Sequence, residues 1–258
     1  MDHVSISVIL ITKNEEKKIR RCLDSVRGLA DEIIIVDDGS TDNTVRISSE
    51  EYNAKIIVHP SGGNFDRQRN LGIEKARGEW ILQMDADEVI PENAREAVRR
   101  ALISRKDCDA FYIFRRDCVF GVPLRHSGRE KALKLFRKNK GRYTGGKIHE
   151  TLKIDGKASD INTDILHYNF DSISEVIARW NFYTDVESAS YMKNGGEHSE
   201  KFLKKRLLYK SLKLFYKHYV RNRAYKDGVY GLIWSILHVI SPLLFWLKVL
   251  EKTVKEKA

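Results

Sequence analysis

The chain has 258 residues, of which 42% are hydrophobic and 10% aromatic, and it carries a formal net charge of +10. At ~100 to 200 residues per domain, this length predicts one large domain or one domain with a substantial appendage. The composition excludes a globally disordered chain, and the positive charge indicates an anionic partner such as nucleic acid, a lipid surface or a phosphorylated substrate.

The first part of the chain alternates apolar runs of strand length with helical patterns. Strands are expected over residues 5–11, 32–40, 54–60 and 79–87, and helices over residues 17–29, 43–51, 67–76 and 93–103. This alternation is typical of β-α units around a mostly parallel sheet. Polar clusters follow the strands, at the edge where open α/β sheets bind ligands.

After Ala110 the pattern changes. Residues 110–120 and 132–138 resemble strands, and residues 139–150 are rich in turn formers. We expect this mixed second half to complete the sheet. A helix is expected over residues 174–192, and Gly195 and Gly196 then break it.

The tail has two parts. In residues 201–220, apolar side chains recur at helical spacing with lysines between them, and ten basic but no acidic residues lie from Lys201 to Lys226. The second part, Val229 to Leu247, contains no Asp, Glu, Lys or Arg. These two parts predict a helical extension.

The uncharged run would be ~28 Å long as a helix, against a hydrocarbon core of ~30 Å, so it could just span a membrane. Pro242 and His238 weaken that interpretation. A basic amphipathic helix followed by a Trp-bearing apolar segment favours a position in the interface of an anionic membrane. Alternatively, the apolar residues pack onto the rest of the chain or onto a partner subunit.

The three cysteines, Cys22, Cys108 and Cys118, are odd in number and show no Cys-x-x-Cys spacing. They suggest neither a disulfide framework nor a zinc site, so we expect a reducing cytosol. The first ten residues carry an early acid and lead directly into a strand pattern, so no signal peptide is expected.

The stretch WILQMDADEVIP, residues 80–91, ends an apolar run in three acids. Side chains alternate across a strand, so Asp85 and Asp87 are expected to point the same way. Two such carboxylates can share Mg²⁺ or Mn²⁺, with a diphosphate completing the coordination. Alternatively, these acids are solvated in a loop, and Asp87 or Glu88 caps the helix beyond Pro91.

A second pair of acids lies in IIIVDDGSTDNT, residues 33–44. Asp37 and Asp38 can accept hydrogen bonds from a base N–H or from ribose hydroxyls. In the alternative interpretation this is a tight turn in which Thr41 or Asp42 caps the next helix. Both interpretations can hold for different residues of the stretch.

Four segments, VILITKNEE, IIIVDDGSTDNT, RQRNLGIEKARGEWILQMDADE and GGKIHE, occur in an order and spacing that resemble family 2 glycosyltransferases, in particular bacterial lipopolysaccharide core glucosyltransferases. The resemblance covers Ser5 to Glu150 and continues weakly through DGVYG near Asp227. It implies an α/β fold with a GT-A type, Rossmann-like nucleotide-sugar domain, a mostly parallel central sheet and a C-terminal helical extension.

The resemblance also implies a nucleotide-diphosphate sugar donor, Mg²⁺ or Mn²⁺, and inversion at the anomeric carbon. Asp85 would approach the ribose and the metal, and Asp87 would be the direct metal ligand. The other residues that it places at the donor are Thr12, Asn14 and Glu15 in the nucleotide pocket, Asp37 and Asp38 at the base or ribose, and Arg69 and Asn70.

Transfer to a hydroxyl requires a base that takes its proton. The best candidate is Glu150, assisted by His149. The Glu-Asp base motif of many relatives is absent from this sequence, and His149-Glu150 occupies the corresponding place in the order of motifs. In the alternative, His149 is packed and Glu150 lies in a surface ion pair.

His167 could bind the metal or diphosphate, or could be a hydrogen-bonded core histidine.

These inferences predict a catalytic domain over residues 1–170, with a nucleotide-sugar half (1–105) and an acceptor half (106–170), and a helical extension over 171–258. The Arg179-Trp180 pair lacks the glutamine of the processive synthases' Gln-x-x-Arg-Trp motif, which favours single-sugar transfer. Several basic residues lie at positions 137–147. They form either a solvated surface or a binding site for a phosphorylated or lipid-linked acceptor.

The expected activity is transfer of one sugar, from UDP-glucose or another UDP-hexose, to a cell-envelope glycan or glycolipid. The expected location is the cytoplasm, peripheral on the inner face of the membrane. One rival, a sugar-phosphate nucleotidyltransferase, would carry a Gly-rich loop where this chain reads TKNEE. A second rival is a basic protein that binds nucleic acid or lipid, and it is suggested only by the tail. The tail has no recognisable DNA or RNA motif, so no nucleic acid partner is expected.

Overall fold

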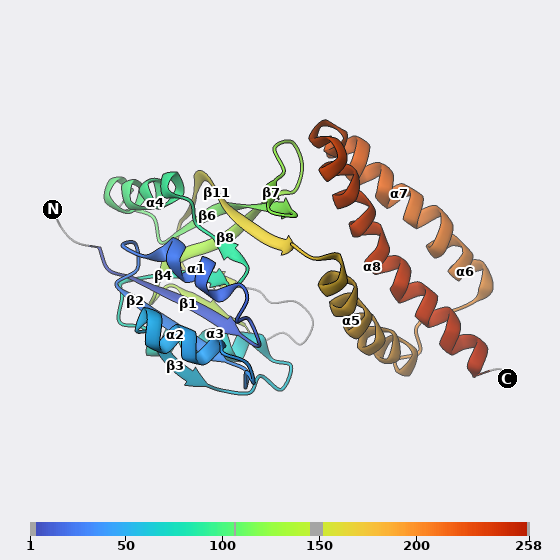
Figure 1. Ribbon diagram of the computed structural model, residues 1–258, viewed down its shortest axis with the longest axis horizontal. Helices are drawn as coiled ribbons and strands as arrows, with labels where there is room; N and C mark the ends of the chain where they lie inside the picture. The colour runs from blue at the N-terminus through green and yellow to red at the C-terminus, as the bar shows by residue number, and fades with distance from the viewer. Residues whose placement is uncertain (1–3, 106, 145–151, 257–258) are drawn as a thin grey trace. The chain divides into compact units, whose positions relative to one another are not determined.

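A computed structural model describes residues 4–105, 107–144 and 152–256 (Figure 1). The chain divides into two compact units, one of residues 1–116 and 130–167 and one of residues 117–129 and 168–258. Residues 117–129 therefore group with the helical tail, although no sequence pattern marked them as part of it.

The first unit is built on a sheet in which four strands run parallel. In spatial order these strands are β3 (Lys55–Val58), β2 (Glu32–Asp37), β1 (Ile6–Thr12) and β4 (Trp80–Asp85). The sheet continues through β8 (Arg129–Arg137), β6 (Ala110–Val119), β11 (Ala158–Phe170) and β5 (Glu88–Val89), with β7 (Val122–Pro123) beside β6. The predicted α/β class with a central sheet is confirmed. The parallel part of this sheet consists of β3, β2, β1 and β4, whereas β8 pairs antiparallel with β4 and β5 pairs antiparallel with β11.

Helices cover both faces of the parallel strands, which explains their nearly continuous apolar sequences. On one face, α1 (Ile19–Val26), α2 (Thr44–Tyr52) and α4 (Glu92–Ser104) bury side chains such as Leu23, Ile47 and Val98. On the other face, α3 (Phe65–Lys75) contributes Ile73. Each helix lies within a few residues of its predicted range.

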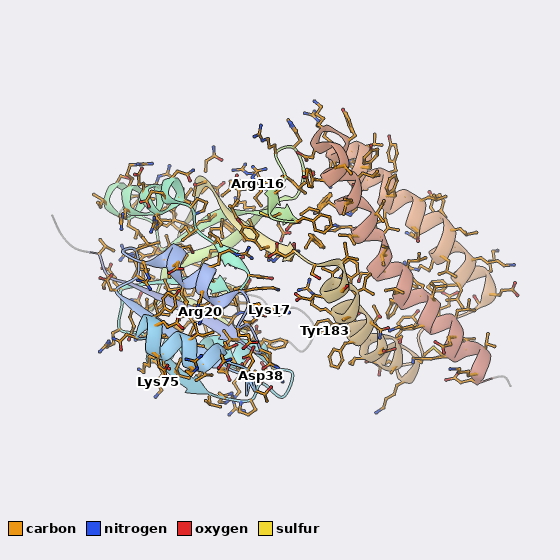
Figure 2. All side chains as sticks on the ribbon, viewed as in Figure 1. Lys17, Arg20, Asp38, Lys75, Arg116 and Tyr183 are labelled. Carbon is orange, nitrogen blue, oxygen red and sulfur yellow. The ribbon has the colours of Figure 1, made fainter. Side chains whose placement is uncertain are left out.

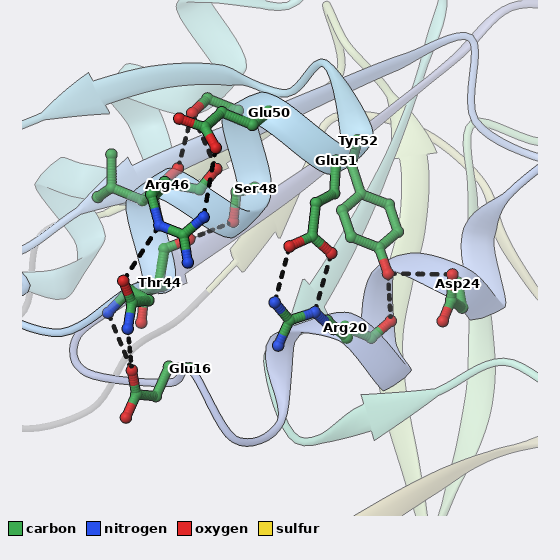
Figure 3. A network of polar contacts seen from close by, with 12 residues as sticks. Glu16, Arg20, Asp24, Thr44, Arg46, Ser48, Glu50, Glu51 and Tyr52 are labelled. Atoms are coloured by element: carbon green, nitrogen blue, oxygen red, sulfur yellow. Dashed lines mark hydrogen bonds and ion pairs between the residues drawn. The ribbon is translucent and has the colours of Figure 1, made fainter.

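A polar network ties the outer surfaces of α1 and α2 together (Figure 3). Arg20 binds Glu51 through two hydrogen bonds of 2.8 and 2.7 Å, and the Tyr52 hydroxyl donates to Asp24 over 3.0 Å. Exposed pairs of this kind are screened by water and add little stability. Their effect is to hold in place the two helices whose N-terminal loops carry Asn14 and Asp38.

A small antiparallel ribbon, β9 (Gly141–Tyr143) and β10 (Leu152–Ile154), lies next to α3. Asn70 of α3 holds it, because its amide nitrogen donates to Tyr143 O (2.8 Å) and its amide oxygen accepts from Tyr143 N (2.9 Å). Gly141 is required by packing, since a Cβ there would overlap the ring of Phe136.

The second unit is helical. Figure 1 shows α8 (Gly228–Lys255) between α5 (Ile173–Lys193) and the stretch that contains α6 (Glu200–Lys204) and α7 (Ser211–Tyr216). Two π-helical segments, η1 (Lys205–Lys210) and η2 (Lys217–Arg221), continue α6 and α7, and a 3₁₀ turn, η3 (Ala224–Asp227), precedes α8. Trp234 and Leu237 of α8 are in the core of this unit.

Asp227, which belongs to the DGVYG segment, has a structural role in this unit. Its carboxylate accepts hydrogen bonds from the backbone N–H groups of Arg125, His126 and Ser127 at 2.8 to 3.0 Å. Gly231 lets α8 approach η3, because a Cβ there would overlap the carbonyl oxygen of Ala224. Asp227 thus fixes the loop of residues 125–127, and Gly231 permits close packing of α8 against η3.

Candidate active site

The carboxyl ends of β1, β2 and β4 meet at one edge of the sheet. The register pairs Thr12 with Asp37 and Ile11 with Asp85, so three of the predicted site residues come from adjacent strand ends. The sequence predicted this convergence because parallel strands end at the same edge.

Asp37 is buried, and the protein itself occupies its carboxylate. It accepts hydrogen bonds from the Thr12 hydroxyl at 2.9 Å, from Ser40 N at 2.7 Å and from the Ser40 hydroxyl at 2.6 Å. This arrangement matches the tight-turn interpretation for Asp37, and Thr12 is bound into the same turn. Contact of either residue with a nucleotide stays a prediction.

Asn14 and Glu15 lie in a loop that is fastened to the turn after β2. Asn14 adopts a left-handed conformation with φ of 56°, which asparagine tolerates better than most residues. Its side-chain oxygen accepts from Thr41 N at 2.8 Å, and Glu15 N donates to the Thr44 hydroxyl at 2.7 Å. The loop backbone is therefore preorganised beside the strand ends.

Asp38 (Figure 2) follows β2 directly and keeps part of its carboxylate accessible. Burial would raise its pKa, but hydrogen bonds from the Ser61 backbone and from Lys13 lower the pKa below its ordinary value. Lys13 Nζ lies 3.3 Å from Asp38 Oδ2. Asp38 is thus an ionised hydrogen-bond acceptor at this edge of the sheet.

Asp85 belongs to a buried ion cluster that the sequence analysis missed. Lys134 of β8 places its Nζ 3.1 Å from Asp85 Oδ2 and 2.8 Å from Glu88 Oε2. Glu88 is fully buried, and it also accepts the Asp85 backbone N–H at 2.9 Å. The only sequence signal is a lysine inside the otherwise apolar ALKLF strand and an acid next to the Asp-x-Asp pair.

The pKa values of the three cluster members shift in different directions. Burial opposes ionisation of Asp85, but the charges of Lys134 and Arg69 outweigh it and lower the pKa of Asp85 to about 2. Burial raises the pKa of Glu88, only partly offset by Lys134. The two carboxylates raise the pKa of Lys134 despite its burial. Asp85 therefore stays an anion that is fixed in one direction.

Asp87 faces a different partner. β4 ends at Asp85, two residues before the predicted strand end, so the expected alternation of side chains does not extend to Asp87. Instead, Asp87 Oδ1 lies 3.6 Å from His167 Nε2. His167 is placed there because β11 pairs with β5, with His167 opposite Glu88. This strand pairing thus brings His167 next to Asp87, the acid predicted to bind the metal.

Arg69 lies close enough to the acids for its charge to lower the pKa of Asp85. Its guanidinium also lies over the Tyr143 ring, 5.2 Å from the ring centroid. Asn70, by contrast, uses its amide group to hold β9. These contacts place Arg69 at the acidic site and give Asn70 a structural role there.

The basic segment before residue 145 divides into two parts. Arg137 pairs with Glu79 and Asp109, and Lys138 donates to the Ala76 carbonyl, so both support the fold. Arg142 lines a cavity of about 810 Å³ beside α3 and β9, and together with Lys140 it lines a second cavity of about 630 Å³. Glu150 and His149 lie outside the described residues.

Among residues 4–105, 107–144 and 152–256, no three His, Cys, Asp or Glu side chains gather in a group that could hold a metal ion. The acid and the histidine that face each other at this edge are Asp87 and His167, whereas Asp85 is engaged by Lys134. An oxygen and a nitrogen 3.6 Å apart fit two positions around one ion, and Mg²⁺ commonly takes only one or two carboxylates and leaves the rest to water and phosphates.

The family model described as glycosyl transferase family 2 matches residues 7–155. The chain belongs to this family. The predicted resemblance is confirmed, and the match includes Asp37, Asp38, Asp85, Asp87 and Lys134. Membership decides for sugar transfer over the nucleotidyltransferase alternative.

Two relatives illustrate the similarity along the whole chain. An uncharacterized glycosyltransferase of Rickettsia conorii is 26% identical over 98% of this chain and 92% of its own length. The lipopolysaccharide core biosynthesis glycosyltransferase LpsC of Rhizobium meliloti is 26% identical over 96% of this chain and 92% of its own length. Among solved structures, S. aureus TarS 1–349 in complex with UDP-GlcNAc matches with 15% identity, coverage of 98% and 92%, and a TM-score of 0.48.

Proposed function

We propose that the chain is an inverting transferase that moves a single sugar from UDP-glucose or another UDP-hexose to a hydroxyl of a cell-envelope glycan or lipid-linked acceptor. The observation that carries the proposal is the placement of Asp38 and Asp85 at one sheet edge, with Asp87 facing His167 next to it. The similarity to LpsC supports an envelope acceptor.

Asp87 and His167 would hold Mg²⁺ or Mn²⁺ in this proposal. The carboxylate suits either ion, and neutral imidazole is a competent second donor. When bound, the ion would stabilise the charge that develops on the departing diphosphate. Asp85 is held in place by Lys134 to orient the ribose, and Asp38 accepts hydrogen bonds from the nucleoside.

Glu150 takes the proton of the acceptor hydroxyl in this scheme, and His149 assists it. The phosphate-binding potential of Lys140 and Arg142, at the cavities beside α3, suits a phosphorylated or lipid-linked acceptor. The enzyme acts in the cytoplasm, as a peripheral protein on the inner face of the membrane.

Calorimetric titration of UDP, ADP and GDP tests the donor site. We expect UDP to bind most tightly, and binding in EDTA to be weaker than in Mn²⁺ by at least about tenfold, because the ion bridges protein and diphosphate. An Asp107→Ala variant, altered at an exposed acid, serves as the control and should bind like the wild type. Absence of nucleotide binding under every condition would refute the proposal.

The His167→Gln variant tests the second metal donor. Glutamine keeps a polar side chain of similar reach but removes the imidazole, so the Mn²⁺ concentration for half-maximal activity should rise at least about tenfold. His126→Gln, altered at an exposed loop histidine, is the matched substitution. An unchanged Mn²⁺ requirement in His167→Gln would assign this histidine to the core instead.

A further inference from the structure

Residues 200–221 form one continuous helical stretch in which α-helical and π-helical segments alternate. Because π turns contain more residues than the 3.6 of an α-helix, side chains four positions apart stay on one side of this stretch. The row Leu203, Leu207, Phe215 and Tyr219 is buried or half-buried against the unit. Rows one and two positions further on face outward.

The first of these outward rows is apolar. It consists of Leu208, Leu212, Tyr216 and Val220, which are exposed by 67%, 71%, 61% and 41%. Single exposed apolar side chains are ordinary, but a contiguous row of them on a helix marks an interaction surface. We call these four residues the outer row.

The neighbouring row is basic. It contains Lys205, Lys213, Lys217 and Arg221, together with Tyr209, and all five are exposed. Within the described part of the chain, none of the four cations forms an ion pair. No acidic residue occurs from Lys201 to Lys226 to neutralise them. The apolar row is thus edged by positive charge, and the acid at the start of this stretch, Glu200, pairs with Lys204 rather than with the basic row.

We propose that the outer row and this basic row form a docking face for a bilayer that contains anionic lipids. The stretch would lie along the membrane, with its apolar row below the head groups and its cations among the phosphates. This deepens the peripheral location proposed above, and it does not depend on the sugar-transfer chemistry. The exposed apolar row favours lipid over nucleic acid, which would leave that row in water.

The assignment places membrane contact on α6 to η2, although α8 is the more apolar helix. By length and composition, the described residues 224–255 could cross a membrane. In the structure, however, α8 buries Trp234, Leu237 and Val249, and Lys248 of α8 bonds to Asn181 and Asp185 of α5. These contacts pack one side of α8 against the other helices of this unit, and 22% of its most apolar stretch is buried.

Sedimentation with vesicles tests the docking face on the full chain. We expect the wild type to bind phosphatidylglycerol-containing vesicles, to bind pure phosphatidylcholine at least about tenfold more weakly, and to be released by salt. Leu212→Glu should weaken binding at least about tenfold, because it places a carboxylate in the apolar row. Val229→Glu, at a 60% exposed apolar residue of α8, is the matched control and should bind like the wild type.

UDP binding is measured on the same preparations. It should be equal in all three proteins, so loss of vesicle binding cannot be attributed to unfolding or to a failed donor site. Vesicle binding by Leu212→Glu at the wild-type level would overturn the proposal. So would duplex DNA binding as tight as that of anionic vesicles, or a wild-type oligomer that Leu212→Glu dissociates, since either result assigns the face to another partner.

Discussion

Asp87→Ala is expected to lower kcat/KM for sugar transfer by about 10³ or more, equivalent to about 4 kcal/mol of transition-state stabilisation. Asp87 is the one acid of the strand-end pair whose carboxylate faces a second donor, His167, at 3.6 Å. Asp85 is already bonded to Lys134. Loss of Asp87 therefore removes the oxygen donor for which the cluster offers no substitute.

The loss should appear in a defined set of measurements. Excess Mn²⁺ should restore little activity, and the calorimetric UDP signal in Mn²⁺ should fall to the level seen in EDTA. Thermal unfolding should change little, because Asp87 is only partly buried and its contact with His167 is a single long pair. Full activity with an unaltered response to Mn²⁺ would refute the metal role, and Asp107→Ala controls for loss of an acid as such.

Periodicity and strand order were enough to predict that these acids lie at one edge of the sheet. The parallel strands are local apolar runs, and acids that follow them must meet where the strands end, so Asp37, Asp38 and Asp85 could be grouped from the sequence. The position of Asp87 could not be predicted as well, because alternation holds only inside a strand and β4 ends at Asp85.

The residues that contact these acids were harder to predict. Lys134 is 49 positions from Asp85 and reaches it only because β8 pairs antiparallel with β4. His167 reaches Asp87 through the pairing of β11 with the two-residue strand β5. Such pairings depend on the tertiary fold and have no local signal beyond a polar side chain in an apolar strand. Burial of a charge is visible only once its partners are placed.

Lys134→Met should destabilise the fold by about 3 to 5 kcal/mol near neutral pH, the usual cost of removing one partner of a buried ion pair. Methionine fills a similar volume and cannot balance Asp85 and Glu88. Lys131→Met on the same strand is the matched control. Lys131 pairs with Asp160 at 2.7 Å, and both side chains are more than 40% exposed, so its loss should cost less than about 1 kcal/mol.

The pH dependence separates charge from packing in this variant. In the wild type, Lys134 holds the pKa of Asp85 at about 2, below its ordinary value, so this acid contributes stability that is lost only as the pH falls below about 4. Without Lys134, burial raises the folded-state pKa of both carboxylates above their unfolded values, and such groups lose stability as the pH rises through the folded-state pKa. Urea unfolding of the two proteins should therefore differ most at pH 7 to 8 and less at pH 5. A constant difference across this range would mean that Lys134 acts by filling space, and Asp85 would then owe its orientation to the Glu88 contact with its backbone rather than to a cation.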